Sequence, residues 1–247
     1  LKEEIGFDSE VPIFDPKTKE SEVKRLEYAN HFWETRKRKG VTLYEAEKWM
    51  RERNYFGLMM VNTGEADAMV TGHSRSYPST IKPVMQLIDK APGVSKIATT
   101  NMMMTARGPI FLSDTAINPN PSADDLARIA LMTAKTVRMF GMEPVIAMVS
   151  YSNFGSSNNE GPSKVSQAVA YLHENFPDLI VDGEIQTDFA LNSEMLKSKF
   201  PFSKLVNKKV NTLIFPNLDA ANITYKLLKE LNKAESIGPI ILGLDKP

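Results

Sequence analysis

Carboxylates and amides directly follow two short apolar runs in the C-terminal half of the chain. They are Asp182, Glu184, Gln186 and Asp188 after residues 179–181, and Asn217, Asp219 and Asn222 after residues 213–215. The carboxyl ends of buried strands are where open α/β sheets bind ligands, so these groups could orient a polar substrate. Such residues also cap helices, and Asp188 is equally suited to starting a helix over 188–197.

A third polar loop follows the apolar run 145–149 and precedes a helix-like segment. It contains the small residues Ser152, Asn153, Gly155 and Ser156. Small hydroxyl residues and glycine let backbone N–H groups approach a phosphate, and a following helix N-terminus adds favourable partial charge. The same residues serve equally well in an ordinary strand-to-helix turn. The composition therefore allows both a phosphate site and a structural loop.

Three cations in the N-terminal third could grip an anion. Arg36 opens the basic run 36–39, and Arg75 and Lys82 flank a second polar loop. Arginine can hold a phosphate or carboxylate with two parallel hydrogen bonds, whereas lysine acts as a point charge. Each also has a simpler interpretation. The run 36–39 would complement the dipole of a helix that Gly40 caps, and Arg75 and Lys82 would be ordinary surface charges.

Composition argues against several classes of function. The 247 residues include 30 basic and 30 acidic side chains, so no net field attracts nucleic acid or an anionic membrane. With no cysteine and three scattered histidines, the sequence predicts no metal site. It shows no dinucleotide, Walker, nucleophile-elbow or zinc-protease motif, no membrane span and no signal peptide. We expect a cytoplasmic protein.

The order of the elements predicts an α/β fold with a mostly parallel sheet. A capping box at Thr42 to Glu45 predicts a helix to about residue 53, and residues 56–61 and 67–70 are predicted as short strands. Residues 94–104 and 109–112 are predicted as a hairpin, which gives Met102 to Met104 a packing role. A helix is predicted from Ser122 to about residue 140. Strand, loop and helix then alternate.

Two punctuated segments predict that the chain crosses between two lobes. Residues 91–93 and the pair Gly238-Pro239 combine the residue types that interrupt helices and strands. We therefore expect a first α/β lobe from residues 1–90 and 239–247, incomplete at both ends, with a second lobe, 91–238, inserted into it. A cleft between lobes is a common ligand site. The chain is also expected to be a piece of a longer protein, because it begins without Met and stops after an apolar run.

Several motifs in order resemble the phosphate acetyltransferase and butyryltransferase family. They are TRKRKG, ADAMVTG, TIKPVMQLI with APGV, DGEIQTDFAL, and LIFPNLDAANITYKLL with KAESIGPIILGL. The resemblance runs from about residue 20 onward. It implies a two-lobed, three-layer α/β/α fold of the isocitrate and isopropylmalate dehydrogenase-like type, with CoA and acyl phosphate meeting in the cleft. It also implies a homo-oligomer, a dimer or larger.

A finer resemblance is to the C-terminal phosphotransacetylase-like domain of bacterial NADP-dependent malic enzymes. It rests on SYSNFGSSNN, HSRSYPST, FPFSKL and NLDAANITYKLL. Transferases carry a Thr-Lys-Gly type loop where this chain has Asn153 to Gly155, and an arginine where it has Lys82. Arg36 matches the family arginine that contacts the CoA or phosphate side. The family's Ser-Arg and Asp would fall beyond Pro247, so no catalytic residue is assigned.

These resemblances imply three possible functions. The first is a regulatory domain that binds acetyl-CoA or a related acyl-CoA, with NADP and a divalent metal used only by a malic-enzyme half outside this chain. The second is an active phosphate acetyltransferase, and the third an oligomerisation domain with a vestigial cleft. The expected acyl-CoA and phosphate ligands are Arg36, Arg75, Lys82, Ser152, Asn153, Gly155, Ser156, Asp182, Gln186, Asp188, Asn217, Asp219 and Asn222.

Overall fold

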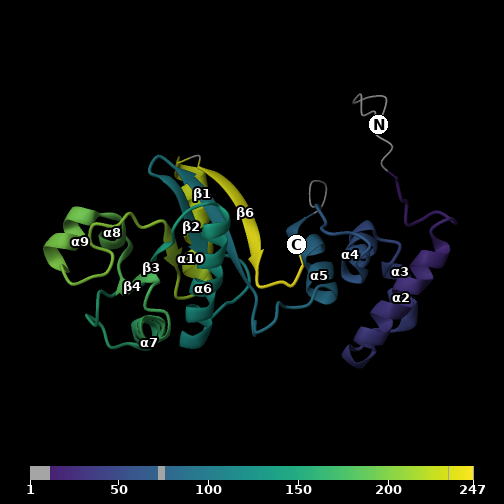
Figure 1. Ribbon diagram of the computed structural model, residues 1–247, viewed down its shortest axis with the longest axis horizontal. Coiled ribbons are helices and arrows are strands. Elements are labelled where there is room, and N and C mark those ends of the chain that lie inside the picture. Colours follow the sequence, from purple (N-terminus) through teal and green to yellow (C-terminus); the bar gives the residue numbers. More distant parts are fainter. Residues whose placement is uncertain (1–11, 72–75, 233, 247) are drawn as a thin grey trace. The chain divides into compact units, whose positions relative to one another are not determined.

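The chain folds into two compact units, seen in a computed structural model that describes residues 12–71, 76–232 and 234–246 (Figure 1). Unit 1 comprises Leu1–Ala91 with Leu244–Pro247, and unit 2 comprises Pro92–Gly243. The chain thus leaves unit 1 within the segment expected from sequence, but returns later than Gly238-Pro239. The reason is that strand β6 (Glu235–Leu242) runs through both residues and pairs with the sheet of unit 2.

Helices make up the regular structure of the described part of unit 1 (Figure 1). They are α2 (Glu22–Arg36), the short 3-10 helix η1 (Lys37–Lys39), α3 (Leu43–Trp49), α4 (Arg53–Thr63) and α5 (Tyr77–Leu87). The predicted capping box is confirmed, because the Thr42 hydroxyl accepts from the Glu45 amide and the Glu45 carboxylate accepts from the Thr42 amide. Gly40 ends η1 in the left-handed conformation, with φ 85°.

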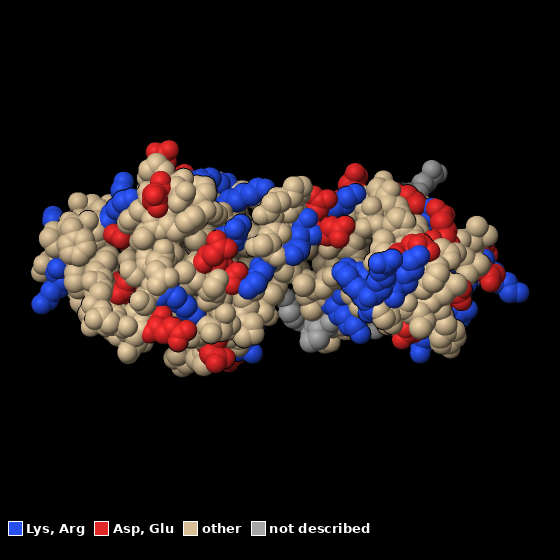
Figure 2. Space-filling view, turned by 90° about the horizontal axis from the view of Figure 1, so that it is seen from below, with Lys and Arg blue, Asp and Glu red and all other residues tan. Residues whose placement is uncertain are grey.

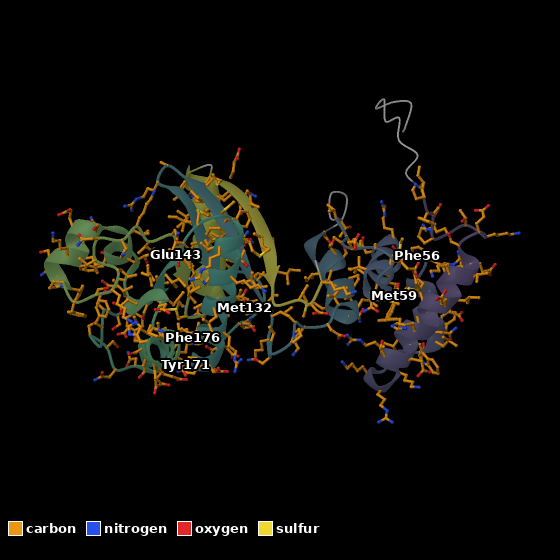
Figure 3. All side chains as sticks on the ribbon, viewed as in Figure 1. Phe56, Met59, Met132, Glu143, Tyr171 and Phe176 are labelled. Atoms are coloured by element: carbon orange, nitrogen blue, oxygen red, sulfur yellow. The ribbon has the colours of Figure 1, made fainter. Side chains whose placement is uncertain are left out.

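The strands predicted over 56–61 and 67–70 are wrong. Residues 56–61 lie inside helix α4, and residues 67–70 form no regular element. The apolar run misled the prediction because α4 is buried on several sides, so it lacks the amphipathic periodicity of a surface helix. Phe56 and Met59 point from α4 into the core of unit 1 (Figure 3), where they pack with Tyr28 and Phe32 of α2.

Unit 2 is built on a six-stranded sheet in the order β4-β3-β5-β2-β1-β6. The remaining strands are β1 (Ala98–Thr105), β2 (Gly108–Ser113), β3 (Val145–Val149), β4 (Ile180–Ile185) and β5 (Thr212–Ile214). Strands β2, β5, β3 and β4 run parallel, and β1 is antiparallel to both β2 and β6. The predicted hairpin is therefore confirmed, and the fold is mixed α/β.

Helices cover both faces of this sheet, which gives three layers (Figure 1). On one face, α6 (Ala123–Met139) and α7 (Glu160–Asn175) pack on Ile146 and Met148 of β3. On the other, α8 (Thr187–Leu191), α9 (Ser193–Lys199) and α10 (Leu218–Asn232) pack on the alternate residues of β3. The single helix predicted over 188–197 is two short helices, because Asn192 breaks the first and caps the second.

Other local predictions have mixed outcomes. Helix α6 begins at the capping box of Ser122 and Asp125 as expected. Met102 and Met103 are buried, but Met104 at the end of β1 is 42% exposed.

The two ends of unit 2 lie side by side, because a β-carbon on Gly243 would meet Val94 at 2.8 Å. In the part of the chain that the structure describes, no helix is both long and apolar enough to cross a bilayer.

Candidate functional site

Four loops meet at one edge of the sheet of unit 2. Strands β2, β5, β3 and β4 are parallel, so their carboxyl ends lie at the same edge, and the loops that leave them occupy residues 114–122, 215–217, 150–159 and 186. This is the edge at which α/β proteins of this kind bind ligands. Most of the sequence-predicted site residues of unit 2 lie in these loops or at the starts of the helices that follow them.

The loop after β3 closes on the carboxylate of Glu184 at the end of β4. The Ser152 hydroxyl donates to Oε1 of Glu184 at 2.9 Å, and the amide of Gly155 donates to the same oxygen at 2.6 Å. The hydroxyl of Ser152 also accepts from the Ser157 amide at 3.0 Å, and that of Ser156 accepts from the Asn153 amide at 3.0 Å. The predicted phosphate-binding residues are therefore brought together, and their donors already have acceptors within the protein.

Glu184 is almost fully enclosed, with 1% of its surface exposed. Among the residues that the structure describes, no group hydrogen-bonds its second oxygen, Oε2. Its backbone carbonyl accepts from the Phe154 amide at 2.8 Å, so the same residue holds the loop through main chain and side chain. Glu184 thus holds the loop after β3 in place through its carboxylate and its carbonyl. From the sequence, its position after an apolar run indicated only that it could lie near a ligand site.

A reciprocal amide pair joins the same loop to the start of α8. Asn153 donates from Nδ2 to Oε1 of Gln186 at 2.9 Å, and the backbone N–H of Gln186 donates to Oδ1 of Asn153 at 2.8 Å. Gln186 also donates from Nε2 to the Tyr151 carbonyl at 2.6 Å. These two predicted site residues are in contact, although they are 33 positions apart in the sequence.

Asp182 serves a different loop. Its Oδ2 accepts from the Ser203 hydroxyl at 2.8 Å and from the Lys204 amide at 2.7 Å, and its Oδ1 accepts from the Gly183 amide at 2.9 Å. The side chain is buried. Within the described structure Asp182 therefore fastens the 203–204 segment to strand β4.

Asp114 is a comparable residue that was not singled out from the sequence. It follows β2 and is buried, and its carboxylate accepts from the amides of Ala116, Ile117 and Asn118 and from both the amide and hydroxyl of Thr99. It thereby fixes the loop that leads to α6. The signal that flagged the other loops, a carboxylate directly after an apolar strand, is present here also.

The remaining predicted residues of unit 2 lie at helix starts. Asn217 accepts from the Ala220 amide at 2.9 Å at the beginning of α10, and Asn222 donates to the Thr115 carbonyl at 3.0 Å. Asp219 and Asp188 are exposed in the first turns of α10 and α8, where a negative charge is favourable. Asn222 thus links helix α10 to the loop after β2, whereas the two aspartates are exposed.

A pocket of about 700 Å³ opens where the N-termini of α6 and α7 approach each other. Its polar lining consists of two lysines, two carboxylates and several amides and hydroxyls, including Lys96, Lys164, Asp125, Glu160, Asn120, Ser122 and Asn158. The Lys164 ammonium donates to the side-chain oxygen of Asn120 at 2.6 Å, and burial lowers its pKa from the ordinary value. The Lys96 ammonium lies 2.7 Å from a carboxylate oxygen of the α6 cap.

Part of this pocket, around Lys164 and the two helix ends, is favourable to an anion, although the carboxylates of Asp125 and Glu160 also line it. Two helix N-termini contribute partial positive charge and backbone donors, and an anion near Lys164 would offset the cost of holding its charge away from water. Neither lysine was predicted as a site residue. Nothing local in the sequence could have identified them, because Lys96 precedes β1 while Lys164 is on α7.

Two of the three predicted cations of unit 1 are on helix α5 or contact it. Arg36 at the end of α2 approaches the Met85 carbonyl of α5 at 3.5 Å, and Lys82, also on α5, lies with its ammonium 5.7 Å from the ring centre of Trp49. Arg75 lies outside the described residues. Figure 2 shows basic side chains gathered on the part of unit 1 where the run 36–39 ends α2. That these cations meet the unit 2 loops in one cleft stays a prediction.

No group of three or more His, Cys, Asp or Glu side chains is arranged to hold a metal ion, as far as the described residues show. The carboxyl edge holds hydrogen-bond donors, lysines and helix N-termini, together with the buried carboxylates of Asp114 and Glu184. Donors, cations and helix ends of this kind bind and orient anionic ligands. Fold and site together define an α/β protein with polar loops gathered at the carboxyl edge of its sheet, where such folds bind ligands.

The chain belongs to the phosphate acetyl/butaryl transferase family, whose model matches residues 2–247. It is 40% identical over 97% of its length to a phosphate acetyltransferase from Synechocystis sp., and 36% identical over 95% of its length to an NADP-dependent malic enzyme from Salmonella typhimurium. It spans about a third of each of these proteins, 34% and 31% respectively.

The fold matches solved structures of the same class. A phosphotransacetylase from Streptococcus pyogenes superposes with a TM-score of 0.87 and 38% identity, over 100% of this chain and 74% of that one. The predicted family and α/β fold are thereby confirmed. Similarity to both a transferase and a malic enzyme leaves the activity itself to be proposed.

Proposed function

We propose that this chain is a phosphotransacetylase-like domain that binds acetyl-CoA or a related acyl-CoA and regulates malate oxidation carried out by another part of a longer protein. The pocket between α6 and α7 carries the binding part of the proposal. It combines two helix N-termini with Lys164, a cation whose nearest hydrogen-bond partner is the neutral Asn120. The link to malate oxidation is supported by the 36% identity to the Salmonella malic enzyme.

Two features support binding without acetyl transfer. Hydrogen-bond donors of the loop from Ser152 to Ser157 are bound to Glu184 or to hydroxyls of the loop itself. The buried carboxylate of Glu184 would also repel a bound phosphate. In unit 1, Lys82 stands where family transferases carry arginine, and it cannot supply the two parallel hydrogen bonds of a guanidinium. Both differences weaken the stabilisation of charge that develops during transfer.

Active acetyl transfer between CoA and phosphate is the alternative. The 40% identity to the Synechocystis phosphate acetyltransferase favours it. In that case the protein would act mainly by placing acyl phosphate against the CoA thiol, with cations stabilising the developing charge. An oligomerisation domain that binds no acyl-CoA is a third possibility.

Calorimetric titration with acetyl-CoA tests the binding step. We expect the chain to bind, and Lys164→Met to weaken binding by about tenfold, since a charge-assisted contact is worth roughly 1.5–3 kcal/mol. Lys135→Met is the matched control, because Lys135 is an exposed lysine on α6 outside the pocket. Absence of binding to the folded wild-type chain at millimolar acetyl-CoA would contradict the proposal.

Two activity assays separate the alternatives. Formation of acetyl-CoA from acetyl phosphate and CoA should be negligible for the longer protein that contains this chain, whereas its malate oxidation should change when acetyl-CoA is added. Arg36→Ala should remove that response and leave malate oxidation without effector nearly unchanged. Transfer at a rate comparable to that of the Synechocystis enzyme, with no effect on malate oxidation, would establish the alternative.

A further inference from the structure

A basic pocket of about 420 Å³ lies at the opposite edge of the sheet of unit 2. It is bounded by the turn between β1 and β2, by the junction of α8 and α9, and by the segment that precedes β5. These segments lie at the amino ends of the parallel strands β2 and β5. The pocket therefore shares no residue with the loops at the carboxyl edge.

Three cations from two distant segments line this pocket: Arg107, Lys208 and Lys209. The Lys209 ammonium lies 3.6 Å from the position that a β-carbon on Gly108 would occupy, so it sits over the turn that contains Arg107. All three side chains are exposed, and none is ion-paired with an Asp or Glu within the residues that the structure describes. Like charges gathered without a counter-charge repel one another, and a bound anion would relieve that repulsion.

The rest of the lining is largely apolar. It includes Pro109, Ile110, Leu191 and Val210, and Ala190 lies at the end of α8. Pockets that bind small organic ligands have this combination, an apolar surface with a few polar groups that set orientation, and volumes of about 300–1,000 Å³. An inorganic anion would leave the apolar part of the lining unused.

We propose that this pocket is a binding site for an organic phosphate ester, with the phosphate held by Arg107, Lys208 and Lys209 and an apolar or aromatic body held against Ile110 and Leu191. Arginine supplies two parallel hydrogen bonds to phosphate oxygens, and the lysines add point charges from the segment that precedes β5. The site is independent of the acyl-CoA site, because its residues are different and it lies at the other edge of the sheet.

Titration with 1-naphthyl phosphate, inorganic phosphate and 1-naphthol on the 247-residue chain tests both halves of the proposal. The naphthyl ester should bind more tightly than either of the other two, because it alone supplies charge and ring together. Binding should weaken as salt is raised. Equal affinity for inorganic phosphate, or no binding of the ester, would overturn the proposed ligand class.

Charge-removing variants locate the site. Arg107→Gln with Lys209→Gln should weaken naphthyl phosphate binding by about tenfold or more, from the loss of two charge-assisted contacts. Lys226→Gln with Lys229→Gln removes the same charge from exposed positions on α10 and should change affinity less than about twofold. Equal weakening in both pairs would show that only net charge matters and would refute the site.

A third variant keeps this test separate from that of the acyl-CoA site. Lys164→Met should leave naphthyl phosphate affinity unchanged, whereas the Arg107 and Lys209 pair should leave acetyl-CoA affinity unchanged. All the altered side chains except Lys164 are exposed, so the unfolding midpoint of each variant should stay close to that of the wild type. If Lys164→Met abolished naphthyl phosphate binding, the ester would occupy the α6–α7 pocket and the proposed second site would be wrong.

Discussion

The Gly155 amide donates to Oε1 of Glu184 across 2.6 Å, which joins the loop after β3 to the carboxyl end of strand β4. Gly155 adopts a φ of 87°, in the left-handed region that glycine enters without strain. The loop therefore reaches Glu184 because a glycine lets the backbone turn there. A carboxylate thus occupies the position where sequence composition allowed a phosphate.

Replacing Glu184 tests this organising role. Glu184→Ala should lower the free energy of unfolding by about 2–4 kcal/mol, because it leaves the Ser152 hydroxyl and Gly155 amide without an acceptor in a closed site. Glu184→Gln should cost much less, since its amide oxygen can still accept both hydrogen bonds. Urea unfolding measures both changes, and equal losses would show that the carboxylate charge, rather than the acceptor, holds the loop.

The Asn153–Gln186 pair offers a test of coupling. Each single change to alanine should destabilise the chain, and the double variant should lose less than the sum of the two. We expect a coupling energy of about 0.5–2 kcal/mol, as found for side chains in direct contact. Thermal or urea unfolding of the four proteins gives this quantity, and strict additivity would mean that the side-chain hydrogen bond from Asn153 Nδ2 to Gln186 Oε1 contributes nothing.

Asp114→Ala should be among the most damaging single changes at the carboxyl edge. The buried carboxylate accepts from three consecutive amides and from Thr99, and several of these donors would lose their partner. We expect a loss of about 3 kcal/mol or more in the free energy of unfolding. Asp219→Ala, an exposed aspartate of the same sheet edge, is the control and should change stability by less than about 0.5 kcal/mol.

Asp125 should make stability depend on pH. Burial alone would raise the pKa of this carboxyl, but hydrogen bonds from Lys96 and Ser122 outweigh it and hold the pKa below the ordinary value. A lowered pKa in the folded state means that the carboxylate stabilises the fold above its unfolded pKa, and that this contribution is lost as pH falls through the folded pKa.

The difference between wild type and Asp125→Ala should therefore be about 1–2 kcal/mol at neutral pH and shrink below about pH 3.9. Unfolding measured from pH 7 down to the acid transition gives this difference. A gap that stayed constant to the lowest pH would mean that packing, rather than the charge, accounts for the effect.

Local signals in the sequence predicted much of the fold. Both capping boxes and the hairpin depend on residues only a few positions apart, so Thr42 and Ser122 could be assigned without tertiary information. Helix α4 was mistaken for a strand because its burial by other helices is a tertiary property. Resemblance to a family supplied the architecture that spacing alone could not.

The site was harder to predict because its contacts join distant segments. The sequence pointed to Ser152, Asn153 and Gln186, but it could not show that their hydrogen bonds end on each other and on Glu184. It also gave no reason to pair Lys96 with Lys164, which are brought to one pocket by the packing of α6 beside α7. Residue type can suggest a phosphate loop, whereas only the fold shows which donors are already in use.

The closeness of Val94 and Gly243 has a consequence for engineering and for evolution. The two ends of residues 92–243 are neighbours, so this unit could be produced alone with its ends joined by a short linker. New chain ends could then be introduced at another surface position. The exposed turn at Ala106 and Arg107 is a suitable place for the new ends. A circular permutant of this kind should fold on its own, and the same adjacency would let an ancestral gene acquire the whole unit in one insertion.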